Sequence, residues 1–261
     1  MIKHIFCDLD GTLYHNGISE DDANAIGEIE KKGVKFHIAT GRIFNQAYKM
    51  TKDKISMNGY YICENGSFIH DSNKEKIFKG TIDDNLVKKV ASRFESKTAH
   101  IYFKYDGKVV LTGGEDTFKR YTSEFTLDPD FTNRDSFNNL VGNIGIVSGD
   151  IEELNRIELY LKSEFSENLD IYFSASHTLN IVPRGVSKRR AIEYVCNILD
   201  ADMDEVATIG DSPNDICMLE GMKYSFAMEN ARDSVKESAN YTASSVKEVL
   251  ENIKKINKNR L

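Results

Sequence analysis

The sequence has little of what marks several common protein classes. Its four cysteines, at positions 7, 63, 196 and 217, lie far apart and form no C-x-x-C pair. We therefore expect buried thiols in a reducing compartment, not disulfides or a zinc site. Only three prolines occur, so no Pro-rich linker marks a domain boundary. No apolar run approaches about 18 residues, which predicts no membrane-spanning helix.

The first residues and the charge balance exclude further classes. Residues 2–7 run straight into Asp8 without a basic leader or a cleavage site, so we expect no secretory signal and a cytoplasmic location. The 34 basic and 41 acidic side chains give a net charge of −7. This balance argues against a nucleic-acid or anionic-membrane partner. The 40% of apolar residues can build a sizeable core, and 261 residues fit one large domain or two modest ones.

Strand and helix patterns alternate in the first and last parts of the chain. Strands are expected over 2–7, 34–39, 205–209 and 224–228, and helices over 19–32, 42–50, 187–199 and 244–256. This alternation predicts an α/β fold, with a Rossmann-like core of parallel strands and right-handed crossovers.

The middle of the chain has a different pattern. Strands at 60–63 and 67–70 flank an Asn-Gly turn, and hairpin-like strands at 101–105 and 108–112 flank Asp106-Gly107. Helices are expected at 83–97 and 150–165, with further strands at 145–148, 170–173 and 179–182. We expect an α+β cap domain over 83–182, inserted into a core made of 1–82 and 183–261.

Two acidic residues follow the first strand. Asp8 and Asp10 are two positions apart, so in an extended chain both carboxylates face the same way. Neighbouring carboxylates repel unless a cation lies between them, and Mg²⁺ suits carboxylate and phosphate oxygens. The alternative is that Asp-x-Asp-Gly forms only a solvated turn.

Two other segments have the composition of anion sites. Thr40-Gly41 closes a strand and precedes a helix, where a hydroxyl and backbone N–H groups can bind a phosphate; simple helix capping is the alternative. Lys188 follows Ser187 at a helix start, where a cation opposes the helix dipole but can serve a bound anion. The alternative is a solvent-facing lysine, because Arg189 and Arg190 follow it.

A final cluster lies in Gly210-Asp211-Ser212-Pro213-Asn214-Asp215. Asp211 ends a strand and is expected to point toward Asp8 and Asp10 as a third carboxylate. Asp215 can instead be the N3 residue of a capping box with Ser212. Asn214 can hold a neighbouring side chain or cap the helix.

The order of these segments resembles the haloacid dehalogenase superfamily of aspartate-nucleophile phosphohydrolases. The sequences Asp-Leu-Asp-Gly-Thr-Leu, Ala-Thr-Gly-Arg, Gly-Val-Ser-Lys and Gly-Asp-Ser-Pro-Asn-Asp resemble its Cof-type branch, and the insertion resembles that branch's type-II cap. Many relatives have Lys-Gly where this chain has Lys188-Arg189.

The resemblance implies a role for each matching residue. Asp8 would attack phosphorus, and Asp10 would be the acid and then the base. Asp8, the backbone carbonyl of Asp10, and Asp211 would bind Mg²⁺. The phosphoryl group would be held by Thr40, Gly41, Lys188 and Asn214, with Asp215 and Arg42 as supporting residues.

The substrate implied by the resemblance is a small phosphorylated metabolite. Hexose phosphates are the expected class, and pyridoxal phosphate or flavin mononucleotide is the alternative. Candidate contacts to the leaving group are Glu64, Asn65, Tyr102, His177 and Arg184. A phosphomutase and a receiver-type signalling module are the alternative functions. A monomer or weak oligomer is expected.

Overall fold

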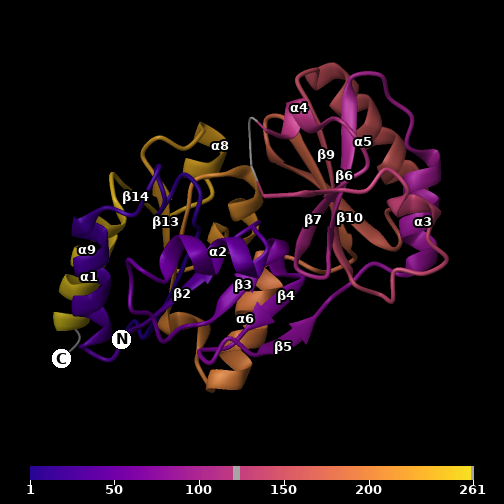
Figure 1. Ribbon diagram of the computed structural model, residues 1–261. Coiled ribbons are helices and arrows are strands. Elements are labelled where there is room, and N and C mark those ends of the chain that lie inside the picture. Colours follow the sequence, from indigo (N-terminus) through magenta and orange to yellow (C-terminus); the bar gives the residue numbers. More distant parts are fainter. Residues whose placement is uncertain (120–123, 260–261) are drawn as a thin grey trace. The chain divides into compact units, whose positions relative to one another are not determined.

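The computed structural model describes residues 1–119 and 124–259 and divides into two compact units (Figure 1). The core unit comprises Met1–Phe78 and Ser187–Leu261, and the inserted unit comprises Lys79–Val186. These divisions lie a few residues from the expected ones at 82/83 and 182/183. None of the helices in the described ranges is long and apolar enough to cross a membrane.

The core unit contains a sheet with the strand order β14-β13-β12-β1-β2-β3-β4-β5. Its strands are β1 (His4–Cys7), β2 (Lys35–Ala39), β3 (Tyr61–Cys63), β4 (Phe68–His70), β5 (Lys76–Lys79), β12 (Val206–Gly210), β13 (Tyr224–Met228) and β14 (Tyr241–Ala243). Its helices are α1 (Glu20–Glu30), α2 (Phe44–Thr51), α6 (Lys188–Leu199), α7 (Ile216–Leu219), α8 (Asp233–Lys236) and α9 (Val246–Lys258).

The strands from β14 to β3 are parallel, which confirms the predicted parallel-sheet core. Strand β1 lies between β12 and β2, with Ile5 opposite both Ala207 and Phe36. The strand after β3 turns back, so β3 and β4 are antiparallel.

Helices cover both faces of this sheet. On β1, the side chains of Ile5 and Cys7 belong to the apolar cluster that also contains residues of α1 and α9, while Phe6 belongs to the cluster of α6. Helices α1 and α9 lie side by side (Figure 1). Because successive side chains of a strand face opposite sides, the fully buried β1 is covered on both faces.

The inserted unit is an α+β sandwich of its own. Its sheet has the order β10-β11-β9-β6-β7-β8. The strands are β6 (Ala99–Tyr105), β7 (Lys108–Leu111), β8 (Thr126–Leu127), β9 (Val141–Ser148), β10 (Leu169–Ala175) and β11 (Thr178–Pro183). The helices are α3 (Asp84–Arg93), α4 (Glu115–Phe118) and α5 (Ile151–Phe165).

The sheet of the inserted unit has one apolar face. Alternate residues such as Phe103 and Ile144 pack with Val87 of α3 and Leu154 of α5. The residues between them include buried polar side chains: Lys104, Asn143 and Asn180. Successive residues of these strands thus face opposite sides, and the apolar side is the one that packs against α3 and α5.

Candidate active site

Asp8 lies directly after the central strand of the core unit. Its backbone N–H donates to the carbonyl of Ile209 on β12 at 2.9 Å, which continues the parallel ladder by one residue. The residue is only 4% exposed. Parallel strands end at the same edge of their sheet, so Asp8, Thr40 after β2 and Asp211 after β12 follow one edge.

Lys188 is the first residue of α6, whose N-cap Ser187 accepts the backbone N–H of Arg190. The side chain of Lys188 is completely buried. Its Nζ donates to Oδ1 of Asp8 and to Oδ1 of Asp215, both at 2.6 Å. The solvent-facing alternative for this lysine is therefore wrong.

Asp215 holds the turn that follows β12. Its Oδ2 accepts the backbone N–H groups of Asp211 at 3.0 Å and Ser212 at 2.9 Å, in the reciprocal arrangement of a capping box. Its Oδ1 at the same time accepts from Lys188. Asp215 therefore closes the capping box and also contacts Lys188.

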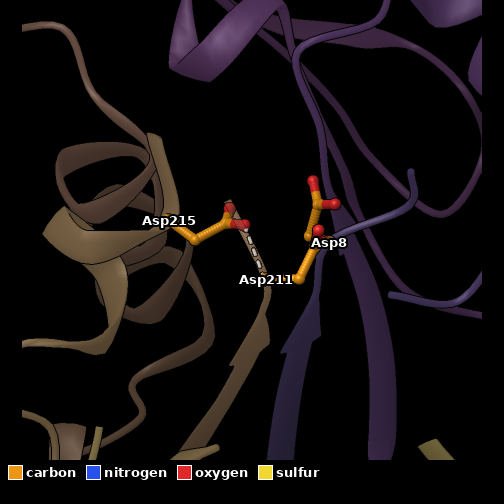
Figure 2. A group of neighbouring side chains, drawn as sticks. All are labelled: Asp8, Asp211 and Asp215. Atoms are coloured by element: carbon orange, nitrogen blue, oxygen red, sulfur yellow. Dashed lines mark hydrogen bonds between the residues drawn. The ribbon is translucent and has the colours of Figure 1, made fainter. Parts of the chain in front are cut away.

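Three carboxylates converge at this edge of the sheet. Asp8, Asp211 and Asp215 each place an oxygen within 4.8 Å of the others (Figure 2). Asp211 is oriented by the hydroxyl of Thr12, which donates to its Oδ1 at 2.6 Å, and by the hydroxyl of Ser212. No pattern in the sequence singles out Thr12, although it directly follows Asp-Leu-Asp-Gly.

The electrostatics of the cluster favour a further cation. Burial raises the pKa of Asp8 well above its ordinary value; Lys188 opposes the shift, while Asp215 and Asp211 add to it. Burial also raises the pKa of Asp211. Burial alone lowers the pKa of Lys188, but Asp215 and Asp8 outweigh it, so that pKa is raised and the ammonium form is held. One ammonium group thus faces three carboxylates.

Two glycines leave the space in which the carboxylates of Asp211 and Asp215 lie. Gly11 has φ +84°, and a Cβ on it would lie 2.4 Å from Oδ2 of Asp211. A Cβ on Gly210 would lie 2.5 Å from the Cβ of Asp215. Any larger residue would push a carboxylate away, which gives these two glycines a physical reason.

Asp10 takes a different partner from Asp8. Its carboxylate accepts from Nε and from one terminal nitrogen of Arg42, both at 2.7 Å. The Asp10 side chain is 48% exposed and that of Arg42 is 29% exposed. Asp10 is not among the three clustered carboxylates; it is a half-exposed carboxylate clamped by a guanidinium.

Thr40 and Asn214 both contact Asn65, which lies in the loop that joins β3 and β4. The hydroxyl of Thr40 accepts the backbone N–H of Arg42 at 3.2 Å, whereas α2 begins later, with Ile43 as its N-cap. Thr40 is therefore not the helix cap. Asn214 donates from Nδ2 to Oδ1 of Asn65 at 2.9 Å. Gly41 lies beside the same amide, because a Cβ on Gly41 would be 3.2 Å from that oxygen.

The remaining leaving-group candidates belong to the inserted unit. Tyr102 is packed across Gly145, and burial raises its pKa to about 12. Arg184 forms an ion pair with Asp170 at 3.6 Å. The ring of His177 has a buried Nδ1 without a hydrogen-bond partner among the described residues.

Comparison with known proteins gives a consistent family. A model of the haloacid dehalogenase-like hydrolases matches residues 5–252. The 5-amino-6-(5-phospho-D-ribitylamino)uracil phosphatase YcsE of Bacillus subtilis is 30% identical over 245 residues, covering 92% of this chain and 89% of the relative. The phosphoglycolate phosphatase of Methanobrevibacter smithii is 27% identical, covering 96% and 97%. A solved haloacid dehalogenase-like hydrolase from B. subtilis superposes with a TM-score of 0.84 at 23% identity, covering 97% and 99%.

Proposed function

Because the chain belongs to the Cof-type haloacid dehalogenase-like hydrolases and is a phosphatase, we propose that it hydrolyses small phosphate monoesters through an aspartyl-phosphate on Asp8. One observation carries this proposal: Lys188 is buried between the carboxylates of Asp8 and Asp215, beside Asp211. A carboxylate attacks a phosphate dianion poorly because like charges repel, and a fixed ammonium next to the nucleophile reduces that repulsion.

The donor set fits Mg²⁺. The side chains of Asp8 and Asp211 supply hard oxygen ligands in a buried, net negative cluster. Both oxygens of Asp215 are engaged by Lys188 and two backbone N–H groups, so we assign Asp215 to support. The resemblance adds the backbone carbonyl of Asp10 as a third ligand. Bound Mg²⁺ would supply charge neutralisation at the phosphoryl oxygens.

Asp8 would form the covalent intermediate. One of its oxygens attacks phosphorus, the bond to the ester oxygen breaks, and the electron pair leaves with that oxygen. Lys188 already holds Oδ1, and among the described residues no hydrogen bond reaches Oδ2 of Asp8. The nucleophile is thereby oriented while one oxygen stays available.

Asp10 would move the protons. Asp10 would take up a proton from solvent before the attack, donate it to the departing ester oxygen, and then accept one from the water that attacks the phosphoaspartate. The clamp from Arg42 fixes the orientation of the Asp10 carboxylate. Because this pair is half-exposed, its carboxylate can exchange a proton with a leaving group or with water.

The phosphoryl group would lie among Thr40, Gly41, Lys188 and Asn214. Sugar phosphates are the proposed substrate class, from the resemblance and because YcsE is named for a phosphorylated ribityl compound. We assign selection of the leaving group to the inserted unit. No nucleic acid or membrane enters the proposed reaction.

A panel of phosphate esters tests the proposal. We expect release of inorganic phosphate from hexose, ribityl and glycolate phosphates with Mg²⁺, and loss of it with a chelator. The Asp8→Asn variant, assayed under conditions that control for deamidation back to aspartate, should lose turnover but unfold like the wild type. Retention of even a few per cent of activity would rule out Asp8 as nucleophile. A requirement for a bisphosphate activator without phosphate release would instead favour a phosphomutase.

A further inference from the structure

The loop between β3 and β4 has an unusual backbone. Glu64, Asn65 and Gly66 have φ values of 52°, 59° and 110° in succession. All three residues are buried, with Asn65 only 1% exposed. Asparagine tolerates the left-handed region better than most residues, but a buried run of this kind persists only where its surroundings fix it.

The surroundings of this loop are the proposed phosphoryl-binding segments. The backbone N–H of Asn65 donates to the carbonyl of Thr40 at 3.0 Å. A Cβ on Gly66 would lie 2.5 Å from the carbonyl of Ser187, the residue before Lys188. The loop therefore contacts both the segment that follows β2 and the start of α6.

The side chain of Asn65 is only half satisfied. Its Oδ1 accepts from Nδ2 of Asn214 at 2.9 Å. Its own Nδ2 is buried and has no hydrogen-bond partner within the described residues. A Cβ on Gly41 would lie 3.6 Å from that nitrogen, so the unpartnered donor lies beside the Thr40-Gly41 segment.

A buried donor without a partner destabilises a fold, and native proteins rarely keep one without a use. An amide N–H₂ can only donate, so its partner must be an acceptor. We propose, on the basis of the proposed function, that Asn65 binds the phosphoryl group directly. Its Nδ2 donates to a phosphoryl oxygen while its Oδ1 accepts from Asn214. Asn65 is then a substrate-binding residue on the phosphoryl side, in place of the leaving-group contact considered from the sequence.

Inorganic phosphate is the probe, and Asn65→Asp is the decisive variant. Aspartate has the same size, tolerates positive φ and keeps an acceptor for Asn214, but it replaces the donor by an oxygen. Isothermal titration with phosphate at fixed Mg²⁺ should show affinity lowered about 10- to 100-fold, the range for a hydrogen bond to a charged group. The kcat/KM for an ester should fall by at least as much.

Asn138→Asp is the matched control. Asn138 also has a left-handed backbone, with φ 52°, but it is exposed and belongs to the inserted unit. This variant makes the same change of charge and should bind phosphate like the wild type. Asn65→Gly suits the backbone, removes both ends of the amide and should also lose phosphate affinity without a lower unfolding temperature.

The possible outcomes separate this inference from the proposed function. Phosphate binding by Asn65→Asp within about twofold of the wild type would overturn the inference, even if the wild type hydrolyses esters. Loss in Asn65→Gly alone would show that the residue acts only through Asn214, which also overturns direct contact. If the wild type hydrolyses no ester but Asn65→Asp loses phosphate affinity, the proposed function fails and the anion site stands.

Discussion

Replacing Gly11 by alanine tests whether Asp211 must lie where the structure places it. The new Cβ would lie 2.4 Å from Oδ2 and 2.9 Å from Cγ of Asp211, whereas ordinary contacts begin at 3.4 Å. The carboxylate must therefore retreat by about 1 Å, and such a shift at a reacting centre can cost about 100-fold in rate. The move also stretches the 2.6 Å hydrogen bond from Thr12.

Gly33→Ala provides the control for backbone strain. Gly33 has the same φ of +84°, but a Cβ there meets nothing within 4 Å. An alanine with left-handed backbone costs about 1–2 kcal/mol at either position. The two variants should thus lose a similar amount of unfolding free energy from strain, and only Gly11→Ala should displace Asp211.

The assays are urea unfolding and a Mg²⁺ titration of ester hydrolysis. We expect Gly33→Ala to keep wild-type kcat/KM, and Gly11→Ala to lose about 100-fold and to need more Mg²⁺ for half-maximal rate. If Gly11→Ala keeps the wild-type rate and Mg²⁺ requirement, Asp211 is not a metal ligand in this position, and the assignment of the site is wrong.

Three further predictions concern charged side chains. Lys188→Met leaves two carboxylates buried without their cation, so the unfolding free energy in urea should fall by about 3–5 kcal/mol, and a loss below about 1 kcal/mol would contradict the buried pairing. Arg42→Met breaks a half-exposed pair with Asp10, so stability should change by less than about 1 kcal/mol while kcat falls at least about tenfold; an unchanged kcat would show that Asp10 needs no clamp. Burial lowers the pKa of His37 in the folded protein well below 6.5. As the pH drops below 6.5, the imidazole is therefore protonated in the unfolded chain before it is protonated in the folded one, and the free energy of unfolding falls. In urea unfolding between about pH 7 and 5, His37→Gln should flatten this dependence by up to about 1.4 kcal/mol per pH unit, and an unaltered slope would place the titration elsewhere.

The parallel core could be predicted because its central strands are short runs rich in apolar residues between turn or loop residues. β1 is buried throughout and β2 is buried after its first residue, so both sequences show the continuous pattern of a strand covered on two faces. The edge strands β5 and β14 were missed because they are short and only partly buried, with no alternation to detect. Helix α8, with four residues, has too little sequence for a period to be recognised.

The sequence predicts which site residues lie close together only where they directly follow parallel strands of the sheet. Asp8, Thr40 and Asp211 each follow a parallel strand, so the fold brings them to one edge. The clamp of Arg42 on Asp10 depends on the path of a loop, and the pattern of residues contains no information about that path. The half-satisfied amide of Asn65 depends on three left-handed residues in succession, which an Asn-Gly turn signal does not specify.

The charges of the site explain why its parts must act together. Three clustered carboxylates and one buried ammonium leave two negative charges in a setting where burial already raises the pKa of Asp8 and Asp211. A divalent cation balances this excess, and only then can a phosphate dianion approach. Lys188 alone does not balance this excess, because its Nζ already donates to Asp8 and Asp215 and keeps only one of its three N–H donors for the anion. Phosphate affinity should therefore depend on Mg²⁺, and hydrogen-bond donors outside the acidic cluster, such as the amide of Asn65, should matter most for holding the anion.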